Sequence, residues 1–119
     1  MPGDLRRGIG SMGEDAAAAW YEARGFEVVD RNWRVREGEI DLVLRSGHTI
    51  VFCEVKTRSS DRFGIPAEAV TATKQRRLRM LAARWLADHP GSRGEVRFDV
   101  ASVSPAGATP AVAVVEGAF

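Results

Sequence analysis

Two consecutive strand-like segments carry charged residues among aliphatic ones, and this pattern most constrains the fold. The first segment runs from Ile40 to Leu44 and the second from Thr49 to Thr57, joined by Arg-Ser-Gly-His. Turn-forming residues between two apolar segments predict an antiparallel hairpin. Four charged side chains lie in or beside it: Glu39, Asp41, Glu54 and Lys56.

A first helix is expected ahead of this hairpin, over residues 11–24. Ser11 to Glu14 reads as a capping box at its start, and Gly25 is a stop signal at its end. Apolar residues at helical spacing predict the core face of this helix. They are Ala16, Ala19, Trp20 and Ala23.

A second helix is expected after the hairpin. It would begin at Ala67 or Thr71 and end at Asp88, where the sequence His-Pro-Gly follows. Its periodic apolar residues predict a buried stripe. They are Leu78, Leu81, Ala82 and Trp85.

Shorter strands complete the predicted order. We expect a strand over 26–29 with a continuation over 33–35, a strand over 96–103 and a final edge strand over 112–116. The order is therefore αβββαββ, in a single α/β domain over residues 1–119 with a mixed central sheet flanked by helices.

Composition excludes several classes of protein. Apolar residues form 45% and charged residues 28% of the 119 residues, which excludes a mainly disordered chain. The apolar runs are too short to span a bilayer, and residues 1–10 lack the apolar core of a secretory signal, so no membrane association and a cytoplasmic location are expected. The net charge of +1 means that any nucleic-acid site must be a local basic patch.

The cysteine and the histidines offer no metal or disulfide chemistry by their spacing. One cysteine excludes an internal disulfide and a cysteine-rich zinc site, and the neighbours of Cys53 predict a buried strand thiol. His48 and His89 are far apart in sequence and are expected at the surface.

The charged residues of the hairpin are expected to converge. Alternation places Glu39 and Asp41 on one face of their strand, with Ile40 and Leu42 on the other. Glu54 and Lys56 likewise share a face, so pairing would gather up to three carboxylates and one ammonium.

Carboxylates at close range repel unless a cation lies between them, and hard oxygen ligands suit Mg²⁺ or Mn²⁺. Such an ion suits phosphodiester hydrolysis, and no Ser-His or Cys-His pairing indicates acyl transfer. The alternative is a solvated sheet face with ordinary cross-strand charge pairs, in a structural protein without affinity for divalent metals.

A resemblance adds to this reading. Asp41, followed after twelve residues by Glu54-Val55-Lys56, resembles the bipartite signature of the PD-(D/E)XK nuclease superfamily, which includes archaeal Holliday junction resolvases. Ile40 stands where the name of the superfamily has proline.

Within that superfamily, several ordered segments resemble the bacterial YraN-like family of predicted endonucleases, over about Gly8 to Val103. The segments are Gly13-Glu14, Gly38 to Asp41, Val51 to Arg58, Phe63-Gly64 and Lys74 to Leu78.

The resemblance implies a restriction-endonuclease-like core and a metal site. Asp41 and Glu54 would hold Mg²⁺ or Mn²⁺ with the backbone carbonyl of Val55, and Lys56 would be the catalytic lysine. Glu14 would add a metal or water contact, with the capping box as its structural alternative. Glu39 would have a supporting role, ordering the site beside Asp41.

Further residues are candidates for contact with nucleic acid. Arg58 could meet a phosphate or be a solvated strand-end residue, and Lys74 and Gln75 lie either near the site or on an exposed first helical turn. Arg76 and Arg77 are expected to contact the nucleic-acid backbone.

The resemblance thus implies a magnesium-dependent endodeoxyribonuclease that cuts branched or structured DNA. A homodimer is inferred from the resolvase relatives, which cut two strands symmetrically. The alternative is a nucleic-acid-binding or partner-docking module that keeps the nuclease fold with little or no turnover.

Overall fold

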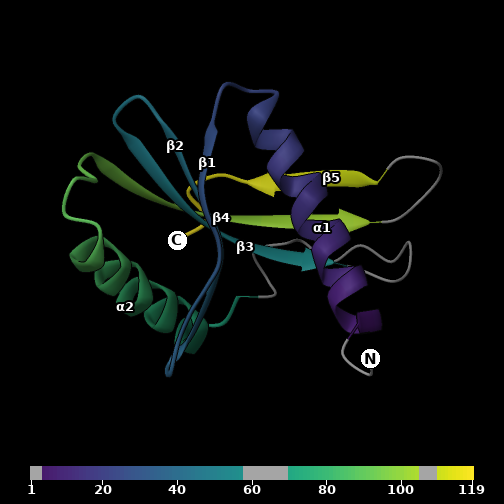
Figure 1. Cartoon of the computed structure of the whole chain (residues 1–119), viewed down its shortest axis with the longest axis horizontal. Helices are drawn as coiled ribbons and strands as arrows, with labels where there is room; N and C mark the ends of the chain where they lie inside the picture. The colour runs from purple at the N-terminus through teal and green to yellow at the C-terminus, as the bar shows by residue number, and fades with distance from the viewer. Residues whose placement is uncertain (1–3, 58–69, 105–109) are drawn as a thin grey trace.

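A five-stranded mixed sheet organises the chain, with its strands in sequential order (Figure 1). The computed structural model describes residues 4–57, 70–104 and 110–119, without the side chains of 4–11. β3 and β4 pair in parallel, and the other neighbouring strands are antiparallel. The strands are β1 (Glu27–Val35), β2 (Gly38–Ser46), β3 (Thr49–Thr57), β4 (Glu95–Ser104) and β5 (Ala111–Val115).

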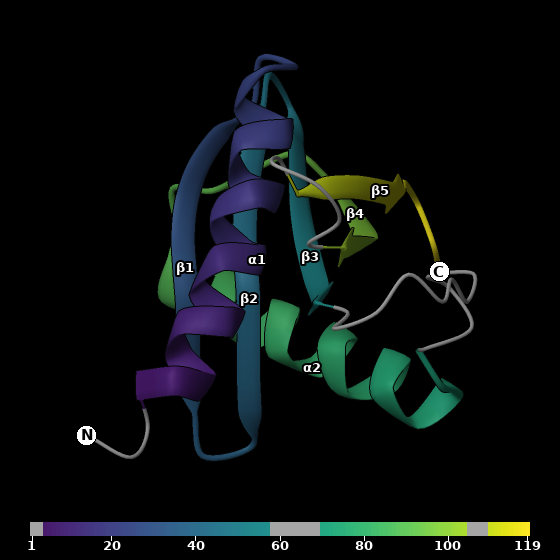
Figure 2. The ribbon, with the colours of Figure 1, turned by 90° about the vertical axis from the view of Figure 1, so that its right-hand side faces the viewer.

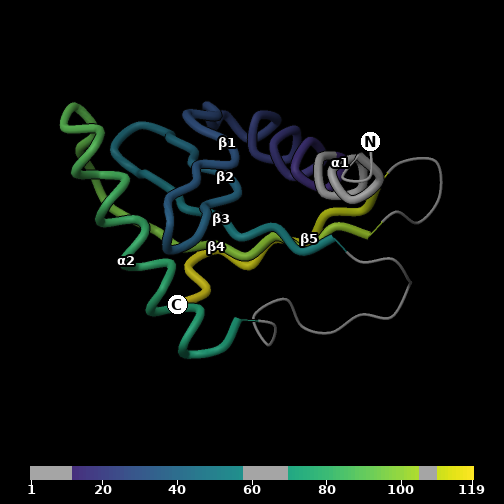
Figure 3. The backbone as a smooth tube through the Cα atoms, turned by 60° about the horizontal axis from the view of Figure 1, so that its bottom comes forward, coloured from purple at the N-terminus to yellow at the C-terminus, as the bar shows by residue number. Residues whose placement is uncertain are grey.

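Two helices cover opposite faces of this sheet (Figure 3). They are α1 (Asp4–Glu22), ahead of the strands, and α2 (Ala72–Asp88), between β3 and β4. Figure 2 shows α1 lying along β1 and β2. The expected order αβββαββ, with a mixed central sheet flanked by helices, is confirmed.

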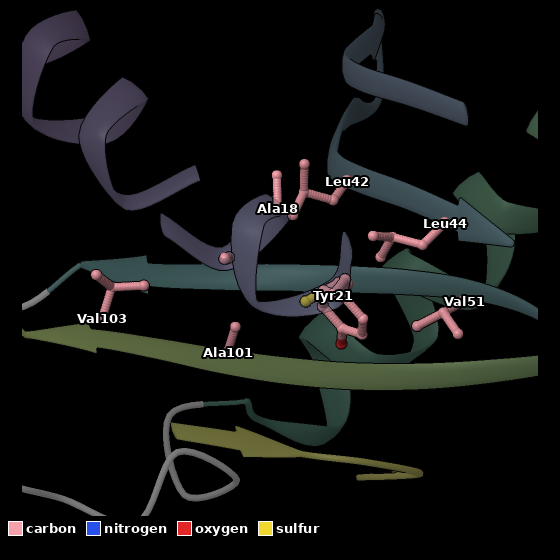
Figure 4. Packing of buried hydrophobic residues seen from close by; sticks show 9 residues of the cluster. Ala18, Tyr21, Leu42, Leu44, Val51, Ala101 and Val103 are labelled. Carbon is pink, nitrogen blue, oxygen red and sulfur yellow. The ribbon is translucent and has the colours of Figure 1, made fainter. Parts of the chain in front are cut away.

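Each helix packs over its own hydrophobic cluster. On the α1 side, Ala18 and Tyr21 lie over Leu42, Leu44 and Val51 of the sheet (Figure 4). The cluster on the α2 side joins the helix to the other face of the same strands. Its buried members are Ile40, Val43, Ile50, Phe52, Leu81, Ala82, Trp85 and Phe98.

The start of α1 differs from the prediction. The helix begins at Asp4, so Ser11 lies inside it and the capping box is wrong. Because only the first turn of a helix has unpaired backbone N–H groups, a box at this position has none to satisfy. The structural alternative for Glu14 is thereby removed.

The predicted stop signal at Gly25 is confirmed, although α1 ends at Glu22, two residues before the predicted end. Gly25 has φ +88, and its N–H bonds to the Glu22 carbonyl while the Phe26 N–H bonds back to the Tyr21 carbonyl. This pair of bonds is the Schellman motif, in which the left-handed residue is usually glycine. The Phe26 and Tyr21 rings add the usual apolar contact, with centroids 5.3 Å apart.

The buried face of α1 was placed only in part. Ala16 and Trp20 are half-buried, but Ala19 and Ala23 are exposed. Instead, the positions that face the sheet are Gly13, Ala17, Ala18 and Tyr21. Four consecutive alanines offer the same apolar side chain in every direction, so periodicity could not define the buried face.

For α2, the sequence signals proved accurate. Thr71 caps the helix, its side chain accepting a hydrogen bond from the Lys74 N–H at 3.2 Å, and the four expected stripe residues are all buried. The alternative start at Ala67 lies outside the described residues. No helix in the described part of the chain is long and apolar enough to cross a membrane.

A buried carboxylate joins β4 to α1 and to the C-terminal segment. Asp99 is fully buried and accepts hydrogen bonds from the Tyr21 hydroxyl at 2.6 Å, from two guanidinium nitrogens of Arg97 and from the Gly117 N–H. The sequence had indicated only a polar alternation at Arg97 and Asp99. Four donors and a paired cation explain how a charge is tolerated at this depth.

Cys53 is buried, as predicted, and burial raises the pKa of its thiol to about 12. His48 is exposed, also as predicted. The surface prediction is wrong for His89, which is half-buried with its ring stacked on Trp85 at 3.9 Å between centroids.

Gly13 allows α1 to approach β3 closely, and its replacement should destabilise the fold. A Cβ added there would overlap Thr57 Oγ1 and lie 3.2 Å from Thr57 Cβ. We expect Gly13→Ala to lower the free energy of unfolding by about 1 to 3 kcal/mol, measured by urea denaturation.

Gly91→Ala is the matched control, because an added Cβ there meets nothing within 4 Å. It should change the stability by less than about 0.5 kcal/mol. Adding Thr57→Ala to Gly13→Ala should recover part of the loss. Equal stability of Gly13→Ala and the wild type would contradict the close approach.

Candidate active site at the fork between β2 and β3

β2 and β3 separate next to the charged residues of the hairpin. The two strands pair from Ser46 and Thr49 as far as Leu42 and Cys53. Beyond that point β2 stays paired with β1 and β3 with β4, so a fork opens at Asp41 and Glu54 (Figure 1).

At this fork, a side chain accepts a backbone hydrogen bond that has lost its partner on the neighbouring strand. The Val55 N–H donates to Asp41 Oδ2 at 2.8 Å, in place of a backbone acceptor on β2. Among the residues that the structure describes, it is the only hydrogen-bond donor to this carboxylate. Asp41 is therefore held at the base of the fork by the backbone beside Glu54.

The predicted alternation of faces fails in β2, next to Asp41. The register with β1 shifts between Val28 and Asp30 and is the same on either side of Asn32, whose backbone is left-handed with φ 52. Ile40 packs on the α2 side and Leu42 on the α1 side, so the alternation breaks between these two residues. The expectation that Ile40 and Leu42 share a face is wrong, because alternation holds only in a regular strand.

The charge environment of Asp41 favours its neutral form. The pKa of Asp41 is raised from its ordinary value of 3.8 to about 7, chiefly by burial and also by the charges of Glu54, Glu39 and Glu14, while the Val55 hydrogen bond acts to lower it. Asp41 therefore interacts with each of the other three carboxylates.

Lys56 and Lys74 supply the positive charge of the site. Lys56 Nζ lies 3.2 Å from Glu54 Oε1, with only 27% and 20% of the two side chains exposed. Lys74 reaches the same place from α2: hydrogen bonding between the two amines, followed by the charge of Lys56, lowers the pKa of Lys74. Lys74 thus lies half-buried near Lys56, at the start of α2.

Glu14 and Glu39 lie in different surroundings. Glu14, on α1, is 13% exposed and accepts a hydrogen bond from Asn32 Nδ2 at 2.8 Å. Glu39 is 40% exposed and pairs with Arg34, with Nε and Oε2 2.7 Å apart. Glu14 is thus enclosed beside the site, while Glu39 lies at its exposed margin.

The remaining candidates are spread along α2. Gln75 donates its side-chain amide to the Val70 carbonyl at 3.2 Å, which ties the start of the helix to the segment before it. Arg76 and Arg77 are exposed. Arg58 lies outside the described residues.

Sequence reasoning missed Asn32, although a signal existed. Asparagine is depleted in strands and is among the few residues that adopt positive φ, so its place inside a strand pattern could have indicated a left-handed residue. The pairing of Arg31 with Asp15 at 2.6 Å had no comparable signal.

The donors at the fork fit a hard divalent cation. Asp41 and Glu54 offer carboxylate oxygens and Val55 a carbonyl, and after burial the nearby carboxylates contribute to the raised pKa of Asp41. Within residues 4–57, 70–104 and 110–119, no three His, Cys, Asp or Glu side chains converge as a metal cluster, so the expected gathering of three carboxylates as metal ligands is not confirmed. Mg²⁺ needs only one or two carboxylates from a protein and keeps several waters.

Without metal, Asp41 should make the protein less stable as the pH rises. The folded state binds this proton more tightly than the unfolded chain, so the stabilisation is present below pH 3.8 and is lost as the pH rises through about 7. We expect the free energy of unfolding, measured with a chelator present, to fall by roughly 2 to 4 kcal/mol over this range.

Asp41→Asn keeps a carbonyl acceptor for the Val55 N–H but cannot ionise, so it is the matched comparison. Its stability should lack this decline and should exceed that of the wild type at pH 8. Parallel pH profiles for the two proteins would contradict the assignment.

Comparison with known proteins identifies the family. A UPF0102 protein of Frankia casuarinae is 54% identical over 112 residues, which cover 93% of this chain and 95% of the relative. One of Beutenbergia cavernae is 61% identical over 95 residues, 80% of each chain, and one of Clavibacter michiganensis is 50% identical over 111 residues, 92% of this chain and 94% of the relative. The model of "Uncharacterised protein family UPF0102" matches residues 13–103, and the chain belongs to this family.

Proposed function

We propose that the protein is a metal-dependent endonuclease that hydrolyses phosphodiester bonds in branched or structured DNA in the cytoplasm. The observation that carries the proposal is the fork, where Asp41 and Glu54 lie beside Lys56. The resemblance to PD-(D/E)XK nucleases, on these same residues, supports it. YraN-like membership and a resolvase-like activity are part of this proposal.

The residues of the fork would divide the chemistry among them. Asp41, Glu54 and the Val55 carbonyl would hold Mg²⁺ or Mn²⁺, and Glu14 would bind a water at the same site. The bound ion would supply positive charge to a phosphate oxygen and lower the pKa of the attacking water.

Lys56 would orient that water and offset charge that develops on the phosphate. Its Nζ is already held at the site by the Glu54 carboxylate, 3.2 Å away. No competing nucleophile is offered by Cys53, whose burial raises the pKa of the thiol to about 12. Hydrolysis by water is therefore the reaction that these residues support.

The exposed basic residues of α2 would bind the DNA backbone. Arg84 pairs with Glu37 at 2.6 Å, and Arg79 lies over the rings of Phe98 and Phe119. Arg76 and Arg77 form no ion pair with a described carboxylate, so they are available for phosphates near Lys74. A homodimer would present two such sites, one for each strand.

Cleavage should depend on the metal and on Lys56. We expect wild-type protein with Mg²⁺ or Mn²⁺ to cut a labelled four-way junction or flap faster than duplex or single-stranded DNA. Lys56→Ala should lose at least about 100-fold in rate, because it removes charge stabilisation at the reacting phosphate. Gel electrophoresis of end-labelled DNA measures both.

Lys56→Ala also controls for a contaminating nuclease, whose activity would survive the substitution. Circular dichroism should show that the variant is folded. DNA binding without cleavage that depends on Lys56 would contradict the proposal and favour a binding module with the same fold.

Arg76 and Arg77 should contribute to the salt dependence of DNA binding. Each phosphate contact adds about one to the slope of log K against log salt, so the double variant Arg76→Ala/Arg77→Ala should lower that slope by about 2. Fluorescence anisotropy with a chelator present measures binding alone. Arg84→Ala is the control and should keep the slope, because its guanidinium is paired with Glu37.

A further inference from the structure

Asn32 has an unusual backbone for its place in the fold. It lies in β1 with φ 52, and it is the one non-glycine residue with positive φ in the described part of the chain. Left-handed residues inside strands are strained and persist only where the surrounding structure holds them. Such strain is often found at functional sites.

Asn32 lies on the strand next to the one that carries Asp41. The neighbours of Asn32 pair with Leu42 and Ile40, which places it beside Asp41 on the adjacent strand. It therefore sits between β2, which carries Asp41, and α1, which carries Glu14.

The side chain of Asn32 reaches α1. Its Nδ2 donates to Glu14 Oε1 at 2.8 Å, and the Glu14 side chain is only 13% exposed. Arg31 lies 3.8 Å from the same carboxylate oxygen, but its close contact, at 2.6 Å, is with Asp15. Asn32 thus makes the short polar contact to Glu14.

We propose that Asn32 is a positioning residue, whose amide holds the Glu14 carboxylate at the Asp41 site. This inference rests on the proposed function for its effect on cleavage. Glu14 stands on a helix outside the sheet, so no strand pairing fixes its carboxylate relative to the fork. An amide can fix it without adding a full positive charge that would compete with a metal ion.

A purely structural role, joining α1 to β1, is the competing explanation. The Arg31–Asp15 pair already makes such a link at the exposed side of the helix, where 63% of the Asp15 side chain is accessible. The contact of Asn32 differs because it is directed to a carboxylate that interacts with Asp41.

The variant Asn32→Gly tests the side-chain amide separately from the left-handed backbone. Glycine adopts positive φ without strain, so the left-handed backbone is kept and only the side chain is lost. Asp15→Asn is the control, because it weakens the link between α1 and β1 and leaves Asn32 and Glu14 unchanged.

In cleavage assays, Asn32→Gly should lower kcat about tenfold or more and change KM less than twofold, while Asp15→Asn should keep the wild-type kcat. In a Glu14→Ala background, Asn32→Gly should have no further effect, because its role passes through Glu14. Full activity of Asn32→Gly, or an equal loss in both backgrounds, would overturn the inference.

Urea unfolding of the wild type, Asn32→Gly, Glu14→Ala and the double variant, without metal, tests the contact independently of activity. The shift in midpoint caused by Asn32→Gly should differ between the wild-type and Glu14→Ala backgrounds, because relief of backbone strain is common to both and only the contact with Glu14 is not. If the midpoint shifts are coupled but the wild type does not cleave DNA, the proposed function is rejected and the contact between Asn32 and Glu14 still stands. Additive midpoints would overturn the inference even where the wild type cleaves DNA.

Discussion

The hydrogen bond from the Val55 N–H to Asp41 is the interaction on which the site depends. Where β2 leaves β3, a backbone donor loses its strand partner, and a buried donor without a partner would be destabilising. The Asp41 carboxylate satisfies it at 2.8 Å. The Asp41 side chain therefore pairs with the free backbone donor and also places a partly neutral carboxyl beside Glu54. One residue thus has both a structural and a chemical role.

The rest of the fold brings other elements to this fork. Gly13 lets α1 approach the end of β3, next to Lys56, and thereby places Glu14 near Asp41. On the other face, Thr71 starts α2 just before Lys74, which reaches Lys56. The buried Asp99 joins α1 to β4 through Tyr21. The helices α1 and α2, which lie on opposite faces of the sheet, and the strands β2 and β3 thus all contribute charged side chains to one place.

The sequence predicted the parts of this arrangement that follow local rules. β3 and the stripe of α2 were placed correctly because their apolar residues are unambiguous. The phase of α1 and the faces of β2 were not, since an alanine run has no preferred side and the alternation of β2 breaks at Asp41, opposite the left-handed Asn32. The burial of Asp99 depends on donors far away in sequence, which no local pattern describes.

The burial of the charged residues helps to decide whether they form a functional site or an ordinary solvated face of the sheet. Surface charges on a sheet are expected to be mostly exposed and to change little in pKa. Here Glu54 and Lys56 are mostly covered, Glu14 more so, and the pKa of Asp41 is raised to about 7. Grouping like charges away from water lowers stability, and strongly perturbed groups of this kind are concentrated at functional sites. The burial of these charges and the raised pKa of Asp41 support the proposed cation site over a surface that is merely polar.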